Sequence, residues 1–213
     1  MKKGIVVALV VFGLILMPTI ISAQTWGFNV GINSATFGGD DAENYESKTG
    51  FMFGALSLYP LAANGLCLHV EANYTLKGST MEGRVLVDYD GDGYGDAYID
   101  AKQTIKLTYV EIPILLQYNV KTKGSVQPIF YAGPAVALKM SSKYKLSYSN
   151  TSDTETMKNV KSIDFGLVIG GGIAINKKYY VSARYTMGLA SFSDVVGVDL
   201  KNNVISGIFS MTI

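Results

Sequence analysis

The 213-residue sequence contains a single cysteine and a single histidine. One cysteine excludes an intrachain disulfide and a cysteine-cluster metal site, and one histidine excludes zinc sites built from several histidines. Charged residues are also scarce, at 16% of the chain, where an average soluble domain has about 25%. The formal net charge is only +1 at pH 7. Because no strongly basic field is present to hold phosphates, we expect no nucleic-acid partner.

Residues 1–23 have the layout of a secretory signal peptide. A charged start at Lys2-Lys3 precedes an apolar run, which Pro18 ends shortly before a small residue, Ala23. We expect cleavage after Ala23, which would leave 24–213 as the exported domain. The alternative is a retained N-terminal membrane helix, since the apolar run is almost long enough to span a bilayer.

The rest of the chain alternates apolar residues with small or polar ones at a period of two, which predicts strands and not helices. In 26–33, for example, Trp26, Phe28, Val30 and Ile32 alternate with glycine and asparagine. Segments of this kind, some clearer than others, lie at 26–33, 50–60, 65–77, 104–120, 126–140, 163–175, 179–189 and 203–213. Their lengths match the roughly ten residues that a tilted strand needs to cross a bilayer.

The connections between these segments alternate in length. Three are short, at 61–64, 121–125 and 176–178, and four are long, at 38–49, 80–103, 141–159 and 190–202. Tight periplasmic turns and long outer loops are typical of outer-membrane barrels, whereas a soluble sandwich has no reason to sort its loops by length. We therefore predict an all-β fold: an eight-stranded, antiparallel, up-and-down transmembrane β-barrel in the cell outer membrane.

The chemistry of the two faces predicts which one meets lipid. The bulky apolar set is continuous, and aromatic residues lie near its ends, as in interfacial girdles: Trp26, Tyr59, Tyr118 and Tyr179. The other set is small, polar or charged and suits the inside of a narrow barrel, which side chains fill without leaving a wide pore. We expect outer-membrane lipids around a monomer.

One segment, 104–120, changes its alternation. Ile105, Leu107 and Tyr109 follow one register, whereas the apolar residues from Val110 onward follow the other. A bulge next to Pro113 would explain the change, because proline cannot donate a hydrogen bond to the ladder.

The same segment carries a family resemblance. Residues 109–118, read as Tyr-Val-Glu-Ile-Pro-Ile-Leu-Leu-Gln-Tyr, resemble a motif of the PorT-like outer-membrane β-barrel proteins of Bacteroidota. Further matching motifs are Tyr131-Ala132-Gly133-Pro134, Asp164-Phe165-Gly166, Gly170-Gly171-Gly172, Arg184-Tyr185, Gly188-Leu189 and the final strand from Asn203 to Phe209. The resemblance covers 24–213 and implies an eight-stranded outer-membrane barrel, usually without an assigned activity. Some relatives take part in protein secretion and gliding.

Four charged residues lie on the inward faces that the alternation predicts: Glu71, Glu111, Asp164 and Arg184. A charge inside a narrow barrel is costly unless it is paired. We therefore expect a structural network of ion pairs and hydrogen bonds that plugs the lumen, and Glu111 with Arg184 is the expected pair. The alternative is a proton or ion relay, or a gate.

His69 is a second candidate for chemistry, because Glu71 lies two positions away on the same strand face, as in a general base and its partner. No serine or threonine can be singled out as a nucleophile. A hydrogen-bonded interior histidine is the simpler interpretation, and Cys67 is interpreted as a small interior filler.

The long connection 80–103 contains a spacing that resembles a calcium loop. The proposed ligands are Asp88, Asp90, Asp92, the carbonyl of Tyr94, and Asp96. Ile99 occupies the position of the usual bidentate glutamate, so binding should be weak. The alternative is a hydrated acidic loop.

The sequence thus favours a structural or interaction role through long outer loops, with an unidentified protein partner and no cofactor beyond weakly bound calcium. A membrane-embedded lipid-modifying enzyme and a narrow passive channel for small solutes are the alternatives.

Overall fold

The computed structural model describes residues 24–62, 64–87, 97–148 and 151–213. The predicted signal peptide and the predicted calcium loop both lie outside these residues. The described residues form nine strands: β1 (Thr25–Gly38), β2 (Glu46–Pro60), β3 (Leu66–Val87), β4 (Ala97–Asn119), β5 (Val126–Tyr148), β6 (Thr151–Thr156), β7 (Ile163–Ile175), β8 (Tyr179–Gly188) and β9 (Lys201–Thr212). The described residues include no helix long and apolar enough to cross a membrane.

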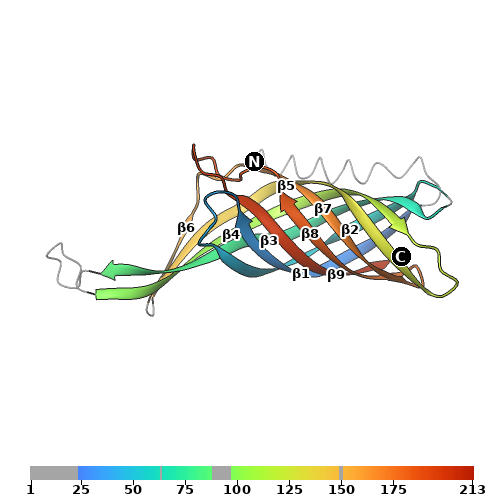
Figure 1. The fold of residues 1–213 in the computed structure, drawn as a ribbon, viewed down its shortest axis with the longest axis horizontal. Coiled ribbons are helices and arrows are strands. Elements are labelled where there is room, and N and C mark those ends of the chain that lie inside the picture. Colours follow the sequence, from blue (N-terminus) through green and yellow to red (C-terminus); the bar gives the residue numbers. More distant parts are fainter. Residues whose placement is uncertain (1–23, 63, 88–96, 149–150) are drawn as a thin grey trace.

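The strands form one sheet that closes on itself. Its order is β4-β3-β2-β1-β9-β8-β7-β5-β6, and β4 also pairs with β5, so every strand except β6 belongs to a ring of eight (Figure 1). Each pair is antiparallel, and β1 joins β9 to complete the circle. The predicted eight-stranded antiparallel barrel is confirmed, and β6 is an additional strand within the predicted loop 141–159.

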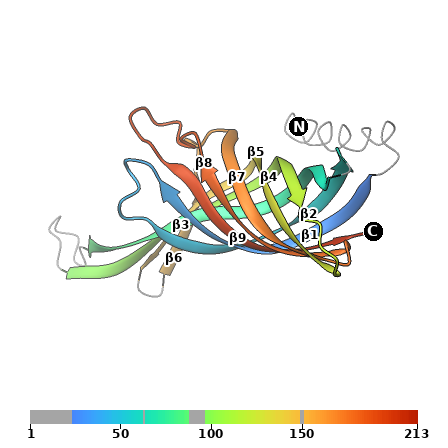
Figure 2. The same ribbon diagram turned by 45° about the vertical axis from the view of Figure 1, so that its right-hand side comes forward.

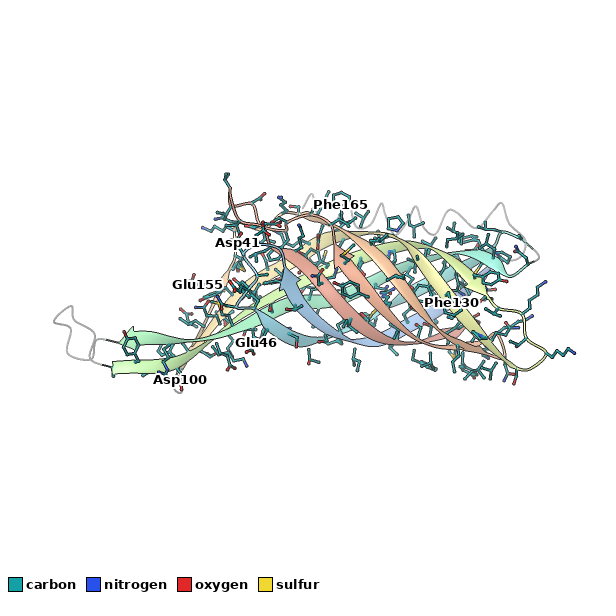
Figure 3. The ribbon with its side chains drawn as sticks, in the orientation of Figure 1. Asp41, Glu46, Asp100, Phe130, Glu155 and Phe165 are labelled. Carbon is teal, nitrogen blue, oxygen red and sulfur yellow. The ribbon has the colours of Figure 1, made fainter. Side chains whose placement is uncertain are left out.

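The two faces of the wall have the polarity of a membrane barrel. On β1, Phe28 and Ile32 are 56% and 70% exposed, whereas Asn29 and Asn33 are 1% and 2% exposed. Phe130 and Phe165 belong to the same outward apolar face (Figure 3). Burial is therefore inverted relative to a soluble protein, because the outward face meets hydrocarbon and the polar face fills the lumen.

The predicted aromatic girdle is present for the most part. Trp26, Tyr118 and Tyr179 are all exposed on the outward face. Tyr59 is the exception: it is buried, and the Gln24 amide donates a hydrogen bond of 2.9 Å to its hydroxyl oxygen.

The expected bulge next to Pro113 is wrong. Burial alternates along β4 without interruption from Ile105 to Gln117, and the β3–β4 register on either side of Pro113 is the same. The irregularity lies on β5, where Met140 is the extra residue between the partners of Thr108 and Tyr109. The apolar residues change from one alternation to the other for a different reason. From Tyr109 toward the outer end of β4, the residues that face the lumen are apolar and no longer polar.

Three strands are much longer than a membrane requires. At about 3.3 Å per residue, the 23 residues of β4 span about 76 Å, compared with a hydrocarbon core of about 30 Å. The upper parts of β3, β4 and β5 join β6 in a sheet that projects from the end opposite the short turns (Figure 2). We call this sheet the extension; its residues are 81–87, 97–106, 143–148 and 151–156. Much of what the sequence presents as long loops is therefore strand.

The short turns follow the expected turn chemistry. Between β7 and β8, Asn176 and Lys177 have φ of 53° and 56°, and the Lys178 N–H donates to the Ile175 carbonyl at 3.0 Å. Two successive positive φ values define a type I′ turn, whose twist matches that of the flanking strands.

Candidate functional site: the charged lumen and its outer cap

The inward face of β3 supplies most of the polar groups in the lumen. Alternation places Cys67, His69, Glu71, Asn73 and Lys77 on that face, all of them buried. They meet side chains of β4, and Arg184 reaches them from β8 on another part of the wall.

Glu71 is the centre of this group. Arg184 Nη1 donates to its Oε2 at 2.8 Å, and the Asn73 amide donates to the same oxygen. His69 Nε2 lies 3.1 Å from the other oxygen, Oε1. The side chains of Glu71 and Arg184 are only 3% and 2% exposed, so water contributes little to solvating either charge.

Glu111 has a partner that the sequence reasoning missed. Its Oε2 forms an ion pair with the Lys77 ammonium, whereas Arg184 Nη2 is 3.8 Å from its other oxygen. The expected pair of Glu111 and Arg184 is thus the weaker contact of each residue. The sequence spacing could have revealed Lys77: it lies six positions after Glu71, and an even spacing along a strand puts both side chains on the same face.

Asp164 lies beside the pair of Lys77 and Glu111, with which it lines one small cavity, but it is not part of an ion pair among the described residues. Its Oδ2 accepts a hydrogen bond of 2.8 Å from the Asn202 amide. Among the residues that the structure describes, no cation lies within ion-pair distance of its carboxylate. The structure therefore brings all four predicted charges into one region of the lumen and adds Lys77. Glu71 and Glu111 pair with Arg184 and Lys77, whereas Asp164 is held by Asn202.

The ring nitrogens of His69 both lie beside acceptor side chains within the lumen. Nδ1 lies 2.9 Å from Gln117 Oε1, and Nε2 faces Glu71. Cys67 is a free thiol, and its sulfur accepts a contact of 3.4 Å from the Asn119 amide. Both side chains are placed by hydrogen bonds and not aimed at an open site.

Little empty space remains beside these groups. The cavity next to His69 and Glu71 has a volume of about 10 Å³, which is about the minimum for one water molecule. A larger hollow of about 310 Å³ lies at the mouth near the short turns, lined by Pro60, Lys121 and Tyr180 among others.

An apolar cluster closes the other end, and we call it the outer cap. Its buried members are Phe37, Ile105, Leu107, Tyr109, Ala137, Val160, Phe192 and Leu200. The rings of Phe37 and Phe192 are 4.7 Å apart, and Tyr45 packs against Phe37 at 5.0 Å. Burial raises the pKa of the Tyr45 phenol in this outer loop, and the nearby Tyr144 raises it further.

Metal binding gains no new candidate. Within the described ranges, no group of three or more histidine, cysteine or acidic side chains could hold a metal ion. The calcium ligands predicted from the sequence lie at 88–96, outside those ranges.

Comparison with known proteins places the fold. Residues 22–194 match the family described as outer membrane protein beta-barrel domain. Neisserial surface protein A is 13% identical, with a TM-score of 0.50 over 90% of this chain and 100% of its own. The outer membrane enzyme PagL is 14% identical, with a TM-score of 0.44 over 90% and 100%. The attachment invasion locus protein Ail of Yersinia pestis is 13% identical, with a TM-score of 0.37 over 89% and 99%. No curated protein sequence matches significantly.

Proposed function

The chain belongs to the outer membrane protein beta-barrel domain family, and from that premise we propose that it is a plugged barrel whose extension presents an interaction surface outside the cell. That it is a small eight-stranded outer-membrane barrel follows from the family and from the ring of strands. The interaction role is supported by one observation. Strands β3, β4 and β5 continue as a sheet well beyond the apolar outward face, while the lumen beneath is filled.

The filled lumen supports an interaction role over a channel. A solute would have to pass the ion pairs of Glu71 and Glu111 and then the outer cap. Opening this path would separate buried charges, which costs several kcal/mol per ion. We therefore expect planar bilayers containing the purified protein to show no stepwise conductance. Regular single-channel steps would instead support a passive pore.

The extension offers a defined place to look for a partner. Tyr98 is 70% exposed near the outer end of β4. A photo-crosslinking amino acid at Tyr98 should capture a discrete partner protein in intact cells, whereas the same group at Lys123 in a short turn should not. Equal products at the two positions, or none at Tyr98, would contradict the interaction role.

The proposal includes no catalytic step. Its support is that both ring nitrogens of His69 are engaged, by Gln117 and by Glu71. Loss of a measured lipid-modifying activity in His69→Ala, with the barrel still folded, would favour the enzyme alternative.

Within the family we propose a PorT-like member from Bacteroidota. The support is the motif 109–118, in which Glu111 contributes to the lumen network while Ile114, Leu116 and Tyr118 lie on the outward face. Association with protein secretion is part of this proposal. Its test is whether the Tyr98 crosslink contains a secretion component.

A further inference from the structure

We infer that lysines on the outward wall of β4 and β5 bind the phosphate groups of outer-leaflet lipids. The lysine patch consists of Lys106, Lys143 and Lys145. The three lysines lie at the base of the extension, and the patch is distinct from the lumen network and from the exposed end of the extension around Tyr98.

The strand register concentrates these charges. Lys106 on β4 lies directly opposite Lys143 on β5, and Lys145 follows two residues later on the same face. Lys48 on β2 is near Lys106, but the β1–β2 register pairs it with buried Ala35, so we do not count it in the patch.

The patch has no internal compensation. Like charges directly opposite one another on paired strands are destabilising. Among the described residues, no carboxylate lies within ion-pair distance of any of the three ammonium groups. The nearby Glu82 instead pairs with Lys102 at 2.9 Å. Glu46 is also close to Lys102, but it is exposed and forms no ion pair with the patch.

The acidic residues of β6 do not fill this gap. Asp153 pairs with Leu146, and Glu155 pairs with Tyr144. Because cross-strand partners share a face, both carboxylates project to the side on which Tyr144 packs against the outer cap. An external anion is therefore the missing partner of the patch.

The distance of the lysines from the apolar part of the barrel wall indicates where that anion comes from. Val110 is the first apolar residue of the outward face of β4, and Lys106 lies four positions beyond it. Four residues span about 13 Å along the strand, or about 10 Å along the membrane normal at a tilt of about 40°. The headgroup layer extends about 5–8 Å beyond the hydrocarbon core. The backbone at Lys106 and Lys143 is therefore just above this layer, and the long lysine side chains can reach back to the phosphates. The lysine side chains point away from the barrel wall, parallel to the membrane plane. A lipid that lies next to the barrel can therefore bring its headgroup against the patch.

The test uses the folded mature chain in detergent and a diphosphorylated glucosamine-disaccharide lipid as the probe. Native mass spectrometry measures its dissociation constant for the unmutated protein, for Lys106→Gln with Lys143→Gln, and for Lys121→Gln with Lys123→Gln. The last variant makes the same change in charge at an exposed turn. We expect about a 30-fold loss for the patch variant, since each lysine near an anionic lipid surface contributes roughly fivefold, and no loss for the turn variant.

Two further arms decide the chemistry. The dephosphorylated form of the same lipid should bind the unmutated protein at the level of the patch variant. Inorganic phosphate should not displace the diphosphorylated lipid at equal concentration. Equal binding of the dephosphorylated lipid, equal loss in the turn variant, or displacement by free phosphate would each overturn the inference.

A folding control separates binding from stability. Removing two facing like charges should leave the temperature of the heat-induced gel shift unchanged or raised in lipid-free detergent. If that variant does not fold, Lys145→Gln alone replaces it, with an expected loss of about fivefold. An unchanged dissociation constant for Lys145→Gln would then overturn the inference.

Discussion

Removing Arg184 should destabilise the barrel far more than removing an exposed lysine. The guanidinium is 2% exposed and donates to Glu71 at 2.8 Å. In Arg184→Met the Glu71 carboxylate keeps only Asn73 and His69 as partners. Breaking a buried pair on one side costs about 3–5 kcal/mol, and these two remaining contacts place the expected loss near the lower end.

A double substitution isolates the charge from the loss of packing. Glu71→Gln with Arg184→Met removes one carboxylate and one cation and leaves the ion pair of Lys77 with Glu111 in place. We expect this variant to lie within about 1–2 kcal/mol of the unmutated protein, because replacing both partners of a buried pair is often nearly neutral. The coupling between the two sites should then reach about 2 kcal/mol, within the range of contacting residues.

The assay is urea unfolding of the refolded protein in lipid or detergent, followed by the heat-induced gel shift. Lys123→Met in a short turn is the control, and its effect should stay within about 0.5 kcal/mol. If Arg184→Met loses no more stability than Lys123→Met, Arg184 does not compensate a buried charge. If the double variant is as unstable as the single one, the loss comes from packing and not from the unpaired carboxylate.

Three further predictions concern topology, the outer cap and calcium. A protease site inserted in 141–159 should be cut on intact cells, whereas one in 121–125 should be protected; the reverse pattern would invert the orientation. Leu107→Ala should cost about 2–5 kcal/mol in unfolding free energy, because a fully buried leucine is removed from the cap, and a loss no larger than that of a lipid-facing leucine would contradict the cap. From the sequence spacing, millimolar calcium should protect 80–103 from proteolysis, and Asp90→Asn with Asp92→Asn should abolish the protection; no protection in the unmutated protein would leave a solvated acidic loop.

The fold could be predicted from the sequence because local alternation decides most of it. Each of Phe28, Val30 and Ile32 needs a lipid face, and the residues between them need the lumen, whatever the neighbouring strand is. Short connections then make successive strands neighbours. By contrast, β6 could not be predicted, since Thr151–Thr156 is polar throughout and exposed on both faces.

The sequence could predict which charged side chains enter the lumen, but not which of them pair. Parity indicates that Glu71, Glu111 and Arg184 point inward, but it does not give their heights along the barrel axis. Those heights depend on strand tilt and stagger, which no local pattern encodes. The ion pair of Glu71 with Arg184 joins residues 113 positions apart, and Lys77 took the place next to Glu111 that the sequence reasoning gave to Arg184.

The change of alternation in β4 suggested a bulge, but it reflects a change in the residues that line the lumen. Ile105, Leu107 and Tyr109 face inward like Glu111, so the strand keeps its register while the lumen changes its chemistry. Apolar side chains inside a membrane barrel have no lipid to meet, so they pack against one another, as Leu115, Ile129 and Val168 do, or against loops. Phe192 and Leu200 from the last outer connection do so. The cap therefore anchors the outer loops to the same strands that continue into the extension, so a force on the extension passes directly into the barrel wall. A surface held in this way is suited to rigid presentation of a binding face, and much less suited to opening and closing a pore.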